Sequence, residues 1–211
     1  MNIQFAVIIS TIIITLLSAA LAALLTETYI KKRAVSHLFW SAGMWLFAIS
    51  ALLEVVFAFG LYSQLLIKTY LLMVSLLVEF LAIGSIMLVK NRIIKYAYSV
   101  FAAASAVIVA YFLITTNIGN IISEYVVYGV IPPMVIVSSS VATFPAAIVI
   151  IAVAALSYLK TRNKKMLSII LGVIIVSIAG TLYIVEFPAA LYFAEFIGIL
   201  LLWIGFYDSK K

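Results

Sequence analysis

The chain has 211 residues, of which 67% are hydrophobic and 9% are charged. Soluble domains are close to half apolar and a quarter charged, so this composition excludes a soluble globular protein. It also excludes a disordered chain, because disordered chains are poor in apolar residues. The lack of Cys excludes a disulfide scaffold, a Cys-ligated zinc site and thiol catalysis. The formal net charge of +6 does not indicate a nucleic-acid partner, because the cations fall in short clusters between long apolar runs.

Seven apolar runs are long enough to cross a bilayer. A crossing helix needs about 20 mostly apolar residues, since each residue rises about 1.5 Å through a hydrocarbon core of about 30 Å. The runs show no period-two alternation, which favours helices over a barrel. The sequence therefore predicts an all-α polytopic membrane protein, a single domain over residues 1–211. Its seven transmembrane helices are expected at 5–25, 38–59, 71–89, 96–115, within 135–158, 166–184 and 189–207.

The fifth span and the connection before it contain the strongest local signals. Pro132 and Pro133 suit a helix start, where a missing N–H costs nothing. Pro145 falls inside the predicted helix and is expected to kink it, with the serines at 138–140 bonding carbonyls freed nearby. We expect the polar stretch 117–130 to be an outer loop that contains a short interfacial helix.

The orientation follows from the Lys and Arg residues. With seven spans, twelve of the thirteen cations lie on one side, between spans one and two, three and four, and five and six, and at the C-terminus. Lys68 alone lies in a loop on the other side. The positive-inside rule then predicts an outside N-terminus and a cytoplasmic C-terminus in the plasma membrane. A cleaved signal peptide is the weaker alternative for the first span, because residues 1–4 contain no Lys or Arg.

Four acidic residues fall inside or at the end of predicted spans, in the outer half or near the midplane. They are Glu54, Glu79, Glu186 and Glu195. A carboxylate at the bilayer centre costs about 2.5 kcal/mol or more, so such residues usually face the bundle interior or water. Lys68 is the only Lys, Arg or His that shares this half. These acids are therefore protonated, bound to cations or reached by water, and the sequence leaves the three alternatives open.

Polar neighbours at helical spacing favour an inward-facing polar stripe. Residues three or four positions apart on a helix lie on the same face. Four such pairs occur here: Ser50 with Glu54, Ser75 with Glu79, Tyr183 with Glu186 and Tyr192 with Glu195. Gly43 and Gly198 extend two of these faces with small residues that suit close helix contact. The candidate ion or substrate site is therefore Glu54, Glu79, Glu195, Ser50, Ser75 and Tyr192. The structural alternative is that each neutral Glu only bonds a neighbouring helix, which is the preferred interpretation for Glu186.

A weak internal repeat relates the first three spans to the last three. Glu54 follows Arg33 by 21 residues, and Glu186 follows Lys165 by the same interval. The segments 78–81 and 194–197 both contain Glu-Phe. This pattern predicts a parallel 3+1+3 arrangement, with halves 1–90 and 135–211 and a linker helix at 96–115, although the register is not continuous.

A 3+1+3 arrangement with an outside N-terminus resembles the SWEET and PQ-loop transporters in topology, although a Pro-Gln pair is absent. The segments 37–41 through Glu54, 180–182 and 206–207 resemble an uncharacterised prokaryotic seven-transmembrane family. The first segment is also similar to the seven-span sensory modules of some histidine kinases, which implies a separate signalling partner. Span seven has no Lys for a Schiff base, so a retinal protein is disfavoured.

Three functions remain open. The leading hypothesis is movement of a small solute or cation, with or without proton coupling, through an outward-facing acidic cavity. Glu54 and Glu79 would carry it, supported by Ser50, Ser75 and Glu195. The alternatives are a sensor or accessory subunit that binds another membrane protein or a second copy, and a lipid-modifying enzyme that uses Glu54 and Glu79 as an acid pair. No cofactor, metal site or nucleic-acid partner is expected, and the bilayer is the predicted environment.

Overall fold

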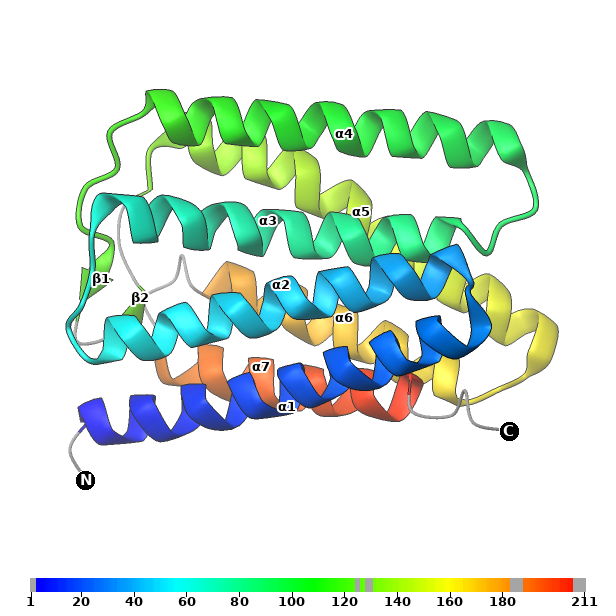
Figure 1. Ribbon diagram of the computed structural model, residues 1–211, viewed down its shortest axis with the longest axis horizontal. Helices are drawn as coiled ribbons and strands as arrows, with labels where there is room; N and C mark the ends of the chain where they lie inside the picture. Colours follow the sequence, from blue (N-terminus) through cyan, green and yellow to red (C-terminus); the bar gives the residue numbers. More distant parts are fainter. Residues whose placement is uncertain (1–2, 124–125, 128–130, 183–187, 207–211) are drawn as a thin grey trace.

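The computed structural model describes residues 3–123, 126–127, 131–182 and 188–206. These residues form seven helices and a hairpin of two very short strands, so the all-α class is confirmed (Figure 1). Helices α1 to α5 are long and apolar enough to cross a membrane, and α6 and α7 are also apolar. The elements are α1 Ile3–Lys32, α2 Val35–Ala58, α3 Gln64–Ile86, α4 Arg92–Thr115, β1 Ile122–Ser123, β2 Val126–Val127, α5 Pro133–Thr161, α6 Lys165–Leu182 and α7 Pro188–Phe206.

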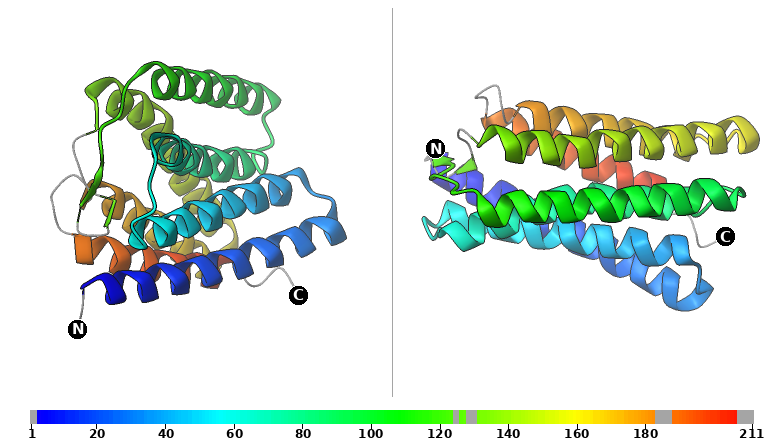
Figure 2. Two further views of the ribbon diagram at one scale, coloured as in Figure 1. Left: turned by 60° about the vertical axis from the view of Figure 1, so that its left-hand side comes forward. Right: turned by 90° about the horizontal axis from the view of Figure 1, so that it is seen from above.

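Six of the helices form a ring, and α4 lies outside it. Each helix in the order α1, α2, α3, α5, α6 and α7 packs against the next, and α7 closes the ring on α1. Helix α4 packs against α3 and α5 and runs along one edge of the bundle (Figures 1 and 2). The fully buried residues of the main apolar core, among them Ile14, Met44, Ala146 and Ile199, come from the ring helices. The centre of the molecule is thus enclosed without α4.

Consecutive helices run in opposite directions, so the basic connections gather at one end. The α1–α2, α3–α4 and α5–α6 connections lie together, at the right of Figure 1. They and the helix ends beside them contain Lys31, Lys32, Arg33, Lys90, Arg92, Lys95, Lys160, Arg162, Lys164 and Lys165. We call this end the basic end. The α2–α3 connection and the hairpin lie at the opposite end.

Two of these basic connections have the same local structure. Arg33 and Arg162 both have left-handed backbones, with φ of 52° and 54°, and each N–H bonds the carbonyl four residues earlier at 2.7 Å. The preceding residues also match, because Tyr29-Ile30-Lys31-Lys32-Arg33 and Tyr158-Leu159-Lys160-Thr161-Arg162 share Tyr, Lys and Arg at the same positions. A left-handed residue is a common way to end a helix, although glycine usually occupies it. Helices α1 and α5 therefore end alike.

Helix α3 begins earlier than the sequence predicts. The expected start was residue 71, whereas the Ser63 side chain accepts a hydrogen bond from the Leu66 N–H and the helix begins at Gln64. Hydropathy missed these first two turns because they contain the polar residues Gln64, Lys68 and Thr69. The sequence predicts Lys68 in a loop, whereas the structure has it within α3. Its amine donates a hydrogen bond to the Ile114 carbonyl at the end of α4, at 3.2 Å. A cation at a helix C-terminus is favourable.

The connection between α4 and α5 also differs from expectation. In place of a short interfacial helix, its described residues form an antiparallel pair in which Ile122 faces Val127 and Ser123 faces Val126. Ile121 and Val127 are each 1% exposed and pack with Phe57, Tyr70 and other residues of a second apolar cluster. The hairpin thus covers the ends of the helices opposite the basic end.

Helix α5 begins at Pro133, as expected, and continues through Pro145 to Thr161 without interruption. The nearby serines have different roles from those predicted. Ser138 bonds the Val135 carbonyl at 3.1 Å, and the Ser139 hydroxyl lies 2.8 Å from the Ser75 hydroxyl of α3. The serine run therefore links α5 to α3.

Candidate functional site

Glu54 is a buried acid near the end of α2. Its side chain is 4% exposed, and its Oε1 accepts a hydrogen bond from the Tyr70 hydroxyl of α3 at 2.7 Å. The Tyr70 ring is held in turn by an edge contact with Phe57, with centroids 5.7 Å apart. The other oxygen, Oε2, is buried and has no hydrogen-bond partner among the described residues. One half of this carboxyl group is thus satisfied and the other half is not.

Glu195 of α7 is the second acid of this kind. It is 9% exposed, and its Oε2 is also buried without a partner within the described part of the chain. The charges of Glu195 and Glu54 interact, although the two residues come from helices at opposite ends of the sequence. Helix α1 packs against both α2 and α7, so the fold brings the two acids to one side of the ring. We call Glu54 and Glu195 the acid pair.

Glu79 lies elsewhere. It is 2% exposed and accepts a hydrogen bond from Ser105, which is on the outer helix α4. It also interacts electrostatically with Tyr98 of α4, whose hydroxyl is buried without a hydrogen-bond partner among the described residues. Because α3 runs from Gln64 to Ile86, Glu79 lies about one turn past the midpoint of the helix, toward the basic end. The observed contacts of Glu79 therefore hold α4 to the ring.

Two of the other predicted site residues lie beside the acid pair, and Ser75 does not. Ser50 is 2% exposed, one turn before Glu54, and its hydroxyl bonds the Phe47 carbonyl at 2.8 Å. Tyr192 is buried in the ring core, one turn before Glu195. Ser75 instead joins Ser139 of α5, as described above. Glu186 and Tyr183 lie outside the described residues.

The two glycines expected to allow close helix contact do so. A Cβ added to Gly43 would lie 3.1 Å from the Leu77 carbonyl of α3. A Cβ added to Gly198 would lie 2.4 Å from a methyl of Val176 in α6. Small residues at these positions let α2 approach α3 and let α6 approach α7.

Sequence reasoning missed a polar stripe on α1. Thr11 and Ser18 are completely buried, and Thr15 lies between them at helical spacing. Each hydroxyl donates to a carbonyl of its own helix, at 2.7 to 2.9 Å, which leaves oxygen lone pairs able to accept. Thr11 and Glu195 both lie about two turns from the starts of their helices, which pack together. Spacings of three and four between hydroxyl residues are the signal that finds this stripe.

Tyr70 and Ser105, the residues that donate to the acids, were also missed. Tyr70 precedes the predicted start of the third span and was not considered, although it lies on the same helix as Ser75 and Glu79. Ser105 lies on α4, which was interpreted only as a linker. No spacing within one helix identifies a donor on another helix, so these contacts require the fold.

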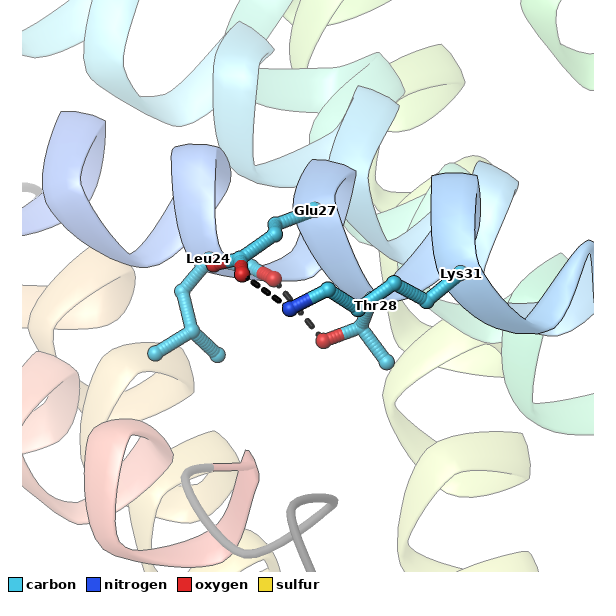
Figure 3. Close-up of polar contacts among 4 residues, drawn as sticks. All are labelled: Leu24, Glu27, Thr28 and Lys31. Atoms are coloured by element: carbon cyan, nitrogen blue, oxygen red, sulfur yellow. Dashed lines mark hydrogen bonds and ion pairs between the residues drawn. The ribbon is translucent and has the colours of Figure 1, made fainter.

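The charge around the acid pair limits its chemistry. No ion pair joins either acid to a described Lys, Arg or His, whereas the exposed Glu27 is paired with Lys31 at the basic end (Figure 3). A buried carboxylate without a partner is costly, and burying an isolated charge usually leads to its neutralisation instead. Each acid is therefore suited to hold a proton or to bind a cation at its free oxygen, and the Tyr70 hydroxyl beside Glu54 is a further oxygen ligand.

A cavity of about 250 Å³ lies at the other end of the ring, the basic end. All six ring helices contribute to it, and Lys32, His37, Trp40 and Phe206 are among the residues that line it. The lining of this cavity, as described, contains Lys32 and His37 and no acid, so it is not the acidic cavity that the sequence predicts. Glu54 and Glu195 are buried and do not line this cavity.

Comparisons of the chain with protein-family models, curated proteins and solved structures found no match. The seven-span families named above therefore remain resemblances, and the buried acid pair inside a six-helix ring is the feature from which a function is inferred.

Proposed function

We propose that this protein moves a small solute or cation across the membrane, and that Glu54 and Glu195 bind a proton or cation during each cycle. One observation carries the proposal. Glu54 of α2 and Glu195 of α7 are buried on helices that both pack against α1, and each has a buried oxygen without a hydrogen-bond partner among the described residues. Ionisable residues within membrane helices usually mark ion or substrate pathways.

The proposal includes seven crossings and an orientation. Helices α6 and α7 would cross beside α1 to α5, because they pack within the same ring. The basic end would face the cytoplasm, following the positive-inside rule. The N-terminus and the hairpin would then lie at the outer face of the plasma membrane. This orientation puts Glu54 in the outer half of its helix, four residues from the end of α2.

The packing order of the ring supports a parallel repeat. Exchanging α1, α2 and α3 for α5, α6 and α7 converts each contact between neighbouring ring helices into another such contact, including α3 with α5 into α7 with α1. The matching Tyr-x-Lys-x-Arg segments at the ends of α1 and α5 also support a parallel repeat. Transporters built from such repeats bind their cargo at the repeat interface and alternate their access.

The two ends of the ring suggest how access alternates. The described structure has its cavity at the basic end, while the hairpin covers the other. In the proposed cycle this is the inward-facing state. The acidic cavity predicted from the sequence would exist in the outward-facing state, after the outer helix ends separate and water reaches Glu54.

Ion flux in sealed proteoliposomes tests this function. Proton uptake would be followed with an enclosed pH-sensitive dye, and Na⁺ or K⁺ uptake with the isotopes, under an imposed membrane potential. We expect flux above that of empty liposomes, reduced about tenfold or more by Glu54→Gln and by Glu195→Gln, since both changes remove the titratable oxygen with little change in volume.

Glu27→Gln is the matched control, because it removes an acid that is exposed and paired at the basic end. It should retain the wild-type flux. Equal flux in the wild type and in both Gln variants of the acid pair would contradict the proposal. If those variants instead lose stability, or lose a protein that co-purifies in mild detergent, the accessory-subunit hypothesis replaces it.

A further inference from the structure

The cavity at the basic end combines an apolar floor with a cationic mouth. Ile150, Ala154 and Ile169 line its inner part and are buried. Trp40 and Phe206 form a tilted aromatic pair on its wall, with centroids 5.1 Å apart. The indole N–H of Trp40 is directed to the Ser85 hydroxyl at 3.3 Å, which fixes the ring. The cavity thus presents carbon on most sides, a surface that excludes a fully hydrated ion.

The mouth has the opposite character. Lys32 lines the cavity, and His37 lies beside it with its ring in edge contact with Trp40. Lys164 in the α5–α6 connection and Lys165 at the start of α6 also lie at the basic end of the ring. Positive charge around a low-dielectric opening attracts anions and raises their local concentration. With apolar walls of this size, below the usual range of about 300–1,000 Å³ for ligand pockets, the occupant must be small.

We propose that this cavity binds a small amphipathic anion, a molecule with one anionic oxygen group on a compact apolar or aromatic body. The anionic group would lie at the mouth near Lys32, and the apolar body would lie against Trp40, Phe206 and Ile169. The same chemistry occurs in a free carboxylate solute and in the head region of an anionic lipid. This site is distinct from the acid pair, and its occupancy can be measured whether or not the protein transports ions.

Saturation-transfer NMR on the protein in nanodiscs of zwitterionic phospholipid tests the proposal, with benzoate as the probe. Benzyl alcohol and benzylammonium, which keep the ring and change the charge, are the comparison ligands. We expect benzoate to bind at least about fivefold more tightly than either of them, since only benzoate combines the ring with a negative group.

Two variants with matched controls locate the binding. Ala154→Phe fills the floor of the cavity, whereas Ala152→Phe adds the same ring to an exposed position of α5. Lys32→Gln removes the cation that lines the cavity, whereas Lys31→Gln removes a neighbouring cation that pairs with Glu27 and does not line it. Ala154→Phe should weaken benzoate binding about tenfold, and Lys32→Gln several-fold, while the two controls bind like the wild type.

Nanodiscs that contain anionic lipid distinguish the two sources. Loss of benzoate binding in those discs, with binding kept in zwitterionic discs, would identify a lipid head group as the natural occupant. Unchanged binding would identify a free solute. Equal binding of benzoate and benzyl alcohol, or benzoate binding that Lys32→Gln leaves unchanged, overturns the proposal. Lys32 is exposed at the end of α1, so this variant tests it even if Ala154→Phe fails to fold.

Discussion

Buried hydroxyl groups in this protein differ in whether they have a partner. The Tyr70 hydroxyl donates to Glu54, while the Tyr98 hydroxyl is buried without a hydrogen-bond partner among the described residues. A hydrogen bond to a buried acid is worth more than an average one, and an unpaired buried group carries a desolvation cost. The same change from Tyr to Phe should therefore have opposite effects at the two positions.

Tyr70→Phe should lower the free energy of unfolding by about 1–3 kcal/mol, because it leaves both Glu54 oxygens unsatisfied. Tyr98→Phe should leave stability within about 1 kcal/mol of the wild type or raise it. Unfolding in mixed micelles, followed by circular dichroism, measures both, with Tyr111→Phe as an exposed control on α4. Equal destabilisation by the first two changes would mean that the Glu54 bond contributes nothing specific.

At the scale of the helices, the sequence predicted the number of apolar elements and most of their limits. Long apolar runs leave the backbone no partner other than itself, so a helix follows from composition alone. The limits failed where polar residues belong to a helix end, as in the first turns of α3, where Ser63 provides the cap. The hairpin was missed because a few extended residues buried by long-range packing have no strong local pattern.

The approach of α2 to α3 depends on Gly84. A Cβ at this position would lie 2.4 Å from the Trp40 ring and 2.9 Å from the Ser36 carbonyl. Gly84→Ala should therefore destabilise the protein by about 1–3 kcal/mol, the usual cost of overpacking, despite the better helix propensity of Ala. It should also shift the Trp40 fluorescence.

Thermal unfolding and emission spectra of Gly84→Ala check this prediction. Gly119→Ala is the control, since nothing lies within 4 Å of the added carbon. If Gly84→Ala were as stable as the wild type, α2 and α3 would be able to move apart without a loss of stability. Trp40 would then not be held as the structure indicates.

At the scale of the whole molecule, the sequence identified the acids but not their grouping. Glu54, Glu79 and Glu195 are conspicuous in an apolar chain, and helical spacing puts Ser50 one turn from Glu54, although the Ser50 hydroxyl bonds the Phe47 carbonyl. Spacing along one helix does not tell which helices become neighbours. The ring closes through α7 on α1, which brings Glu195 toward Glu54, while Glu79 contacts α4. The acid pair is thus a consequence of ring closure.

The central claim is that the acid pair exchanges protons or cations with water inside a membrane. Infrared difference spectroscopy of the reconstituted protein tests it most directly, with pH steps and Na⁺ steps and with Glu54→Gln and Glu195→Gln to assign the carboxyl bands. We predict a band that changes with pH or cation in the wild type, is absent from one Gln variant, and shifts in the other because the two charges interact. If the bands assigned to Glu54 and Glu195 stay unchanged through every pH and Na⁺ step, both acids are structural and the account is contradicted.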